Sequence, residues 1–134
     1  MIDIEPEVFD AVEKRVTAKF PEVDMASEYV PVPSGFPHVS LYEADNHVLT
    51  ETQDPSNTER HAVLMYQADV YSNRIAGKKS ECRKIMAELD AAMADMGFTR
   101  TTLTPVPNMN DATIYRLTAR YTVLADEKYN YRRI

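Results

Sequence analysis

The side chains that most often carry catalysis are few in this chain, and their spacing does not fit a known site. His38, His47 and His61 lack the HExxH-type spacing that binds zinc. Ser34-Gly35 does not form a nucleophile elbow, and three glycines are too few for a phosphate-binding loop. The sequence therefore predicts no catalytic residue, no metal site and no cofactor, and we expect a protein that is not an enzyme.

The single cysteine excludes an internal disulfide and a cysteine-based metal cluster. Cys82 falls within an apolar stripe that repeats every three to four residues, which is typical of the buried side of a helix. We interpret it as a small buried hydrophobic residue. The numerous carboxylates are typical of a solvated surface.

Three arginines offer a different chemistry, the binding of an anion or an acidic partner. If the chain turns near residues 107–109, Arg100 lies close to Arg116 across a β-hairpin, and Arg120 shares their face. Three like charges on one face repel one another unless a partner neutralises them, although a screened and solvated face is the simpler alternative. On the first interpretation, Arg116→Glu or Arg120→Glu should weaken assembly and leave the melting temperature nearly unchanged.

The elements that position these side chains follow from apolar periodicity and from proline and glycine placement. Amphipathic patterns predict helices over residues 5–20 and from Gly77 to Gly97. Strands are predicted over residues 24–32, 36–44, 60–73, 98–104 and 112–124. This order predicts one α+β domain over residues 1–134, with an antiparallel or mixed sheet of about four to five strands and both helices on one face.

The strand over residues 60–73 has the clearest alternation. Ala62, Leu64, Tyr66, Ala68 and Val70 form a core face. The opposite face begins with the apolar Val63 and Met65 and ends with charged and polar residues. Val63 and Met65 need a cover, and we expect a partner to supply it.

Charge is distributed unevenly along the chain. The net charge of −6 argues against a general nucleic-acid binder. Residues 1–59 carry 13 acidic and 3 basic side chains, whereas residues 60–134 carry 8 acidic and 12 basic ones. If the two halves form different surfaces, copies can associate head to tail and close a ring; alternatively, folding interleaves the charges and nothing follows.

Two polar stretches remain outside the predicted elements. Residues 43–60 lack periodicity and predict a long loop, which includes Gln53, Asp54 and Asn57 and which we expect to contact a neighbour. Residues 126–134 predict a C-terminal tail that is flexible or docks on a neighbour. No apolar run reaches the roughly 20 residues that cross a bilayer, and the charged N-terminus is unlike a signal peptide, so we expect no membrane contact and folding in the cytoplasm.

This order of elements, with the segments MYQADVYSN, MGFTRTTLTPVPN and DATIYRLTARYTVL and a lysine-rich start of the second helix, resembles the small tail-completion proteins of long-tailed bacteriophages. Within that group the chain is most similar to the tail terminator, or tail-to-head joining, proteins. The resemblance extends over nearly the whole chain and is clearest from Arg60 to Leu124.

The resemblance implies a structural virion protein that is assembled in the host bacterial cytoplasm. It implies a hexameric ring that caps the tail tube, ends its polymerisation and joins it to the head connector protein, while DNA passes through the channel without being read. The implied partners are other copies of the chain, the tail tube protein and the head connector. Two alternatives stay open: a head-closure or neck connector protein, and a dimeric α+β domain that binds a small ligand.

Overall fold

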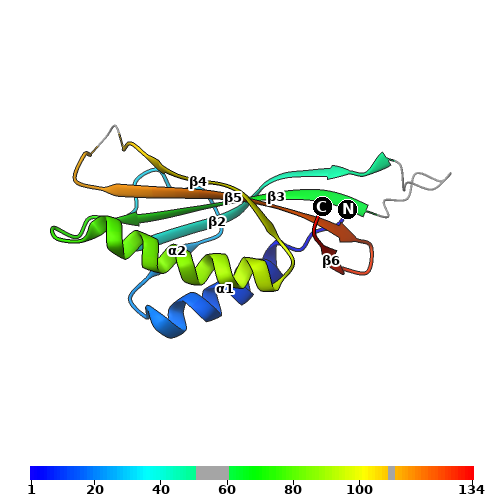
Figure 1. Cartoon of the computed structure of the whole chain (residues 1–134), viewed down its shortest axis with the longest axis horizontal. Helices are drawn as coiled ribbons and strands as arrows, with labels where there is room; N and C mark the ends of the chain where they lie inside the picture. The colour runs from blue at the N-terminus through cyan, green and yellow to red at the C-terminus, as the bar shows by residue number, and fades with distance from the viewer. Residues whose placement is uncertain (51–60, 109–110) are drawn as a thin grey trace.

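A computed structural model describes residues 1–50, 61–108 and 111–134. Within these residues six strands form one mixed sheet, and both helices cover the same face of it (Figure 1). The predicted α+β class and the one-sided helix layer are therefore confirmed. The opposite face of the sheet carries no helix.

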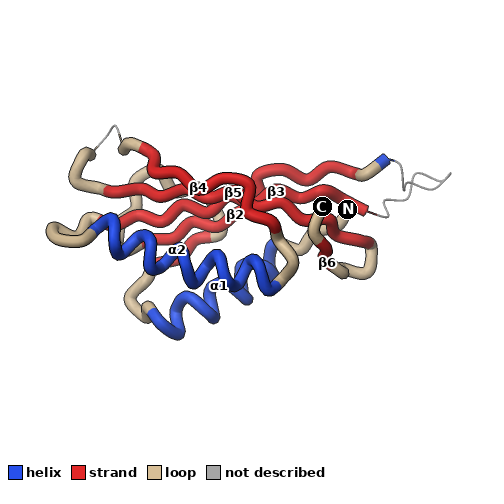
Figure 2. The backbone as a smooth tube through the Cα atoms, in the orientation of Figure 1, coloured by secondary structure: helices blue, strands red, loops and turns tan. Residues whose placement is uncertain are grey.

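The elements follow the predicted order, with one additional short strand (Figure 2). The helices are α1 (Glu5–Lys19) and α2 (Lys78–Asp95), and the strands are β1 (Asp24–Ala26), β2 (His38–Val48), β3 (His61–Ser72), β4 (Thr99–Val106), β5 (Tyr115–Asp126) and β6 (Tyr131–Arg132). The strand order is β1-β2-β3-β5-β4, with β6 paired to β5. β1 runs parallel to β2, and the other pairs are antiparallel.

The two helices begin and end where the sequence predicts. α1 has a proline in its first turn and acidic residues near the positive end of its dipole. α2 lies between two glycines in the left-handed region, Gly77 at φ 88° and Gly97 at φ 94°. A residue with a Cβ is strained in this conformation, which explains why glycine occupies both helix boundaries.

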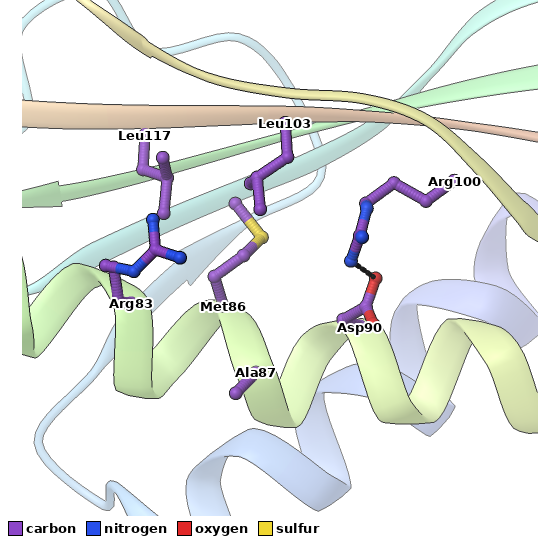
Figure 3. Close-up of a pocket in the computed structure, with 7 residues that line it drawn as sticks. All are labelled: Arg83, Met86, Ala87, Asp90, Arg100, Leu103 and Leu117. Carbon is purple, nitrogen blue, oxygen red and sulfur yellow. Dashed lines mark hydrogen bonds and ion pairs between the residues drawn. The ribbon is translucent and has the colours of Figure 1, made fainter.

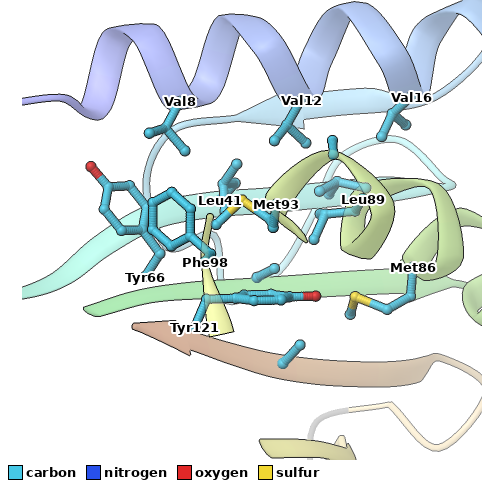
Figure 4. Close-up of a cluster of buried hydrophobic side chains, with 14 of the residues drawn as sticks. Val8, Val12, Val16, Leu41, Tyr66, Met86, Leu89, Met93, Phe98 and Tyr121 are labelled. Carbon is cyan, nitrogen blue, oxygen red and sulfur yellow. The ribbon is translucent and has the colours of Figure 1, made fainter. Parts of the chain in front are cut away.

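The core lies between the helix layer and the sheet (Figure 4). α1 contributes Val8, Val12 and Val16, and α2 contributes residues that include Leu89 and Met93. These side chains pack over Leu41, Tyr66, Phe98 and Tyr121, all of which are buried. Burying each large apolar side chain contributes about 1.5–3 kcal/mol, so this layer is the main source of stability.

Cys82 lies in this core, as predicted. Its side chain is fully buried, and its Sγ lies 3.5 Å from the carbonyl oxygen of Val70. Burial raises the pKa of the Cys82 thiol to about 12, so the reactive thiolate is scarce at neutral pH.

We therefore expect native protein to resist a thiol reagent such as 5,5′-dithiobis(2-nitrobenzoate) at pH 7.5. One equivalent should react once denaturant unfolds the chain, which absorbance at 412 nm measures. Full labelling within minutes in native buffer would contradict the burial of this thiol.

β2 is longer than the sequence predicts. It continues to Val48 and stays paired with β3, through a bulge between Glu43 and Asp45. The prediction that a loop begins at residue 43 is wrong for residues 43–48. The sequence does not predict this extension because its side chains are mostly polar and do not alternate with apolar ones. Backbone pairing with β3 holds it in the sheet.

The predicted strand over residues 24–32 and the predicted C-terminal tail also differ from expectation. β1 has only three residues, because Pro31 and Pro33 cannot donate to a strand ladder. The C-terminal segment 126–134 is not a free tail, since β6 pairs with Leu124 and Ala125 of β5. The hydroxyl of Tyr131 also donates to Glu7 of α1 at 2.6 Å.

Candidate interface on the open face of the sheet

The open face is the side of the sheet that is turned away from α1 and α2. Strand register places a ladder of mostly polar side chains on it, alternating with the core residues of the other face. They are His38, Ser40, Tyr42, Asp45 and His47 of β2; Val63, Met65, Gln67, Asp69 and Tyr71 of β3; Arg116, Thr118, Arg120, Thr122 and Leu124 of β5; and Thr99, Thr102, Thr104 and Val106 of β4.

A polar cluster occupies one end of this face and is centred on Asp69. Its Oδ1 accepts hydrogen bonds from Nε of Arg116 at 3.0 Å and from the hydroxyl of Thr118 at 2.5 Å, and it forms an ion pair with Nη2 of Arg116 at 2.9 Å. Its Oδ2 accepts from Nε2 of Gln67 at 3.2 Å. The Oε1 of Gln67 in turn accepts from Nε of Arg120 at 3.2 Å, so one hydrogen-bonded chain joins β3 and β5.

Asp69 holds a charge inside the protein. Its side chain has no exposed surface, and that of Arg116 is only 19% exposed. A buried carboxylate of this kind is tolerated only when a cation and several hydrogen-bond donors replace its water. Arg116 is therefore a structural partner of Asp69, and the repulsion expected between Arg116 and Arg120 is relieved from within the chain.

Tyr29, from the segment between β1 and β2, packs over this end of the open face. The ring of Tyr29 packs edge-on against Tyr42, with centroids 6.4 Å apart. The guanidinium of Arg116 lies 5.6 Å from the ring centroids of both Tyr29 and Tyr71, within the range of cation–π attraction. This segment explains how a polar sheet face becomes buried without a helix.

Beneath the same cover, His38 is buried and bridges two side chains. Its Nδ1 lies 3.2 Å from Asp24, and its Nε2 lies 2.9 Å from the hydroxyl of Ser40. The hydroxyl of Tyr71 is also buried, and no described residue hydrogen-bonds to it. Burial raises the pKa of Tyr71 to about 12, so this phenol stays protonated at neutral pH.

The other end of the open face is apolar, and the described residues leave it without a cover. Val63, Met65 and Leu124 lie on adjacent strands there and are each only partly buried. Asp45 and His47 of the β2 extension flank them and are exposed. The predicted need of Val63 and Met65 for a cover therefore corresponds to surface that the described residues leave open, whereas the charged end of the strand is the buried one.

Arg120 is the exposed cation of this face, and Arg116 shares the face with it, as predicted. Gln67 fixes the Nε side of the Arg120 guanidinium. No carboxylate among residues 1–50, 61–108 and 111–134 forms an ion pair with Arg120. Its outer nitrogens can therefore meet a carboxylate or a phosphate from a partner without breaking an internal bond.

Arg100 lies on the opposite side of the sheet, so the prediction that it is close to Arg116 is wrong. Its register partner is the core residue Tyr121, and its Nη1 donates to Asp90 of α2 at 3.0 Å. A bulge between Arg100 and Thr102 adds one residue to β4 and reverses the alternation beyond it. A prediction from the odd and even positions of the strand alone could not detect that reversal.

Arg100 instead borders a groove between α2 and β4 (Figure 3). The groove has a volume of about 280 Å³ and is lined by Arg83, Met86, Ala87, Asp90, Arg100, Leu103 and Leu117. The ion pair of Arg100 with Asp90 spans the space between the strand and the helix. The arrangement ties the edge strand to α2, and we assign it a structural role.

Two parts of the predicted interface need separate mention. Gln53, Asp54 and Asn57 lie outside the described residues, so their role stays a prediction. Gln67, Asp69 and Thr118 were missed, although Gln67 faces Arg120 and Asp69 faces Thr118 across the ladder, and Thr118 lies between the two arginines on the same face of β5. An aspartate on the best strand, opposite a strand with two arginines, was the available signal.

The described residues contain no group of three or more histidine, cysteine, aspartate or glutamate side chains that could hold a metal ion. No described helix has the length and apolar character to cross a membrane. The open face combines an apolar end, which the described residues do not cover, with the Arg120 side chain that Gln67 orients. No protein-family model and no curated protein matches this chain.

Proposed function

We propose that this chain is a structural assembly protein of a long-tailed bacteriophage, which closes into a homo-oligomeric ring. The ring, a hexamer by its resemblance, caps the tail tube, ends its polymerisation and joins the tail to the head connector. DNA passes through its channel without being read. The observation that carries the proposal is the apolar end of the open face, where Val63, Met65 and Leu124 remain partly exposed.

Two features make this surface suitable for a permanent contact. First, it is built on the central strands β3 and β5, whose pairing extends over their full length. Second, the buried ion pair of Asp69 with Arg116 fixes the face beside it, so little ordering is needed when a partner binds. An apolar patch beside polar and charged side chains is common in protein–protein interfaces.

The uneven charge of the chain supports a ring in preference to a two-fold dimer. An acidic N-terminal half and a basic C-terminal half are complementary between copies when the contact is head to tail. A symmetric dimer through one patch would bring like charges together.

Negative-stain electron microscopy of the purified protein, alone and with tail tubes, tests the proposal. We expect discrete rings with a central hole, and tubes that carry a ring at one end and stop growing. Binding to the head connector but not to tubes would instead identify the head-closure role. A protein that remains monomeric or dimeric at high concentration, both with and without tubes, would contradict the ring.

A further inference from the structure

Most charged side chains of α2 lie at the end of the helix where the helix dipole makes their charge unfavourable. Lys78, Lys79, Arg83 and Lys84 lie in its first seven residues together with one acidic residue, Glu81, whereas Glu88, Asp90 and Asp95 lie in its second half. Cations are unfavourable near a helix N-terminus and anions near its C-terminus, by about 0.3–1 kcal/mol each. Because this arrangement weakens the helix, we infer that these side chains serve a purpose other than helix stability.

Three of these cations form what we term the basic patch: Lys79, Arg83 and Lys84, all exposed. No carboxylate in the described part of the chain forms an ion pair with them. Nearby cations behave differently, because Arg15 and Lys19 of α1 both bind Glu88, at 3.3 and 3.0 Å. Those two contacts hold the pKa of Glu88 below its usual range, so Glu88 is already engaged and does not neutralise Lys84.

The geometry of the helix layer leaves the basic patch uncovered. α1 ends at Lys19, opposite Glu88, and so the first turns of α2 extend past the end of α1 (Figure 1). Ile75, directly before α2, is fully exposed at the same end of the molecule.

The complementary surface lies on α1. Its acidic stripe, Glu7, Asp10 and Glu13, is exposed and spaced every three residues along the first half of the helix. No described cation forms an ion pair with these carboxylates. Because α1 and α2 run in opposite directions, the acidic stripe and the basic patch lie at opposite ends of the helix layer (Figure 1). They cannot meet within one copy.

We propose that the basic patch of one copy binds the acidic stripe of a second copy of this chain, and that this contact sets the head-to-tail direction of assembly. The inference rests on the proposed function, since it supplies the direction in which a ring closes. Three exposed cations meet three exposed anions, and the contact joins two different surfaces, as ring closure requires.

Charge-swap variants of the full chain test this contact by sedimentation velocity. Reversing the patch with Lys79→Glu and Lys84→Glu, or the stripe with Asp10→Lys and Glu13→Lys, should each weaken self-association at least about tenfold, because like charges then face each other. All four substitutions in one chain restore opposite charges and the native net charge of −6. Self-association should return to within about threefold of the native protein.

Controls separate this contact from a change of net charge or of folding. Lys128→Glu with Arg133→Glu reverses two exposed cations outside the patch and should leave association unchanged. Melting temperatures should stay within a few degrees for every variant, because all the altered side chains are exposed. Raising the salt from about 0.05 to 0.5 M should weaken association of the native protein.

Each remaining outcome is decisive. Undiminished association of either double variant overturns the inference, and so does failure of the four-substitution chain to recover, which would point to a different acidic partner. A native protein without self-association at low salt also overturns it. If rings form equally well in all of these variants, the charged contact is wrong but the proposed function is not. If the protein forms open chains that depend on these charges but no rings, the contact is supported and the proposed ring is contradicted.

Discussion

Replacing Arg116 with alanine should lower the free energy of unfolding by about 3–5 kcal/mol, the usual effect of removing one partner of a buried ion pair. The carboxylate of Asp69 has no exposed surface, and Arg116 gives it a hydrogen bond at 3.0 Å and an ion-pair contact at 2.9 Å. Without the guanidinium, a negative charge remains buried with only Thr118 and Gln67 to stabilise it. Urea denaturation at neutral pH, followed by circular dichroism, measures the change.

The second half of this experiment removes both charges. Asp69→Asn combined with Arg116→Gln leaves neutral side chains that can still hydrogen-bond, so most of the lost stability should return. The coupling free energy between the two sites should be about 1–3 kcal/mol, as for residues in one hydrogen-bonded network. Arg120→Ala is the matched control, because that arginine is exposed and should change stability by about 0.5 kcal/mol or less. A similarly small effect for Arg116→Ala would mean that water reaches Asp69.

This structural role changes one expectation drawn from the sequence. Arg116→Glu should strongly destabilise the monomer, because it places a second carboxylate against Asp69. Only Arg120→Glu should weaken assembly without a change in melting temperature. The arginine that serves folding and the arginine that is free for a partner therefore lie four residues apart on the same strand face.

The sequence predicted most of the fold because its apolar periods are strong. The apolar alternation from Ala62 to Val70 fits only a strand, and the apolar stripe from Cys82 to Met93 fits only a helix. The buried residues match both predictions. The two left-handed glycines then mark where α2 begins and ends. These signals are local, so they can be recognised without knowing which elements are neighbours.

The failures concern features that are not local. Two bulges, one in β2 and one in β4, change which side chains share a face. No amino-acid type at these positions predicts a bulge. Tyr29, which packs over the polar cluster, is distant in sequence from Asp69 and Arg116. Burial of Asp69 could therefore not be inferred from β3 alone, where it appeared as a charge at the end of a strand.

Met65→Glu should abolish ring formation while leaving the monomer folded. Met65 lies at the uncovered apolar end of the open face, between Asp45 and Thr122 on the adjacent strands, and is only partly buried. In the monomer the new carboxylate can reach water. In an assembled ring it would be buried without a cation, at a cost of about 2–5 kcal/mol for each contact.

The comparison that decides this prediction pairs assembly with stability. Ala18→Glu adds the same charge at an exposed position on α1, away from the open face, and should preserve both the rings and the melting temperature. If Met65→Glu leaves ring counts in negative-stain images at the native level, the apolar end of the open face is not the subunit contact. If it instead unfolds the monomer, Met65→Ser, which removes apolar surface without adding charge, becomes the test. Loss of rings by a folded Met65→Ser variant would assign this surface to assembly, because nothing else about the chain would have changed.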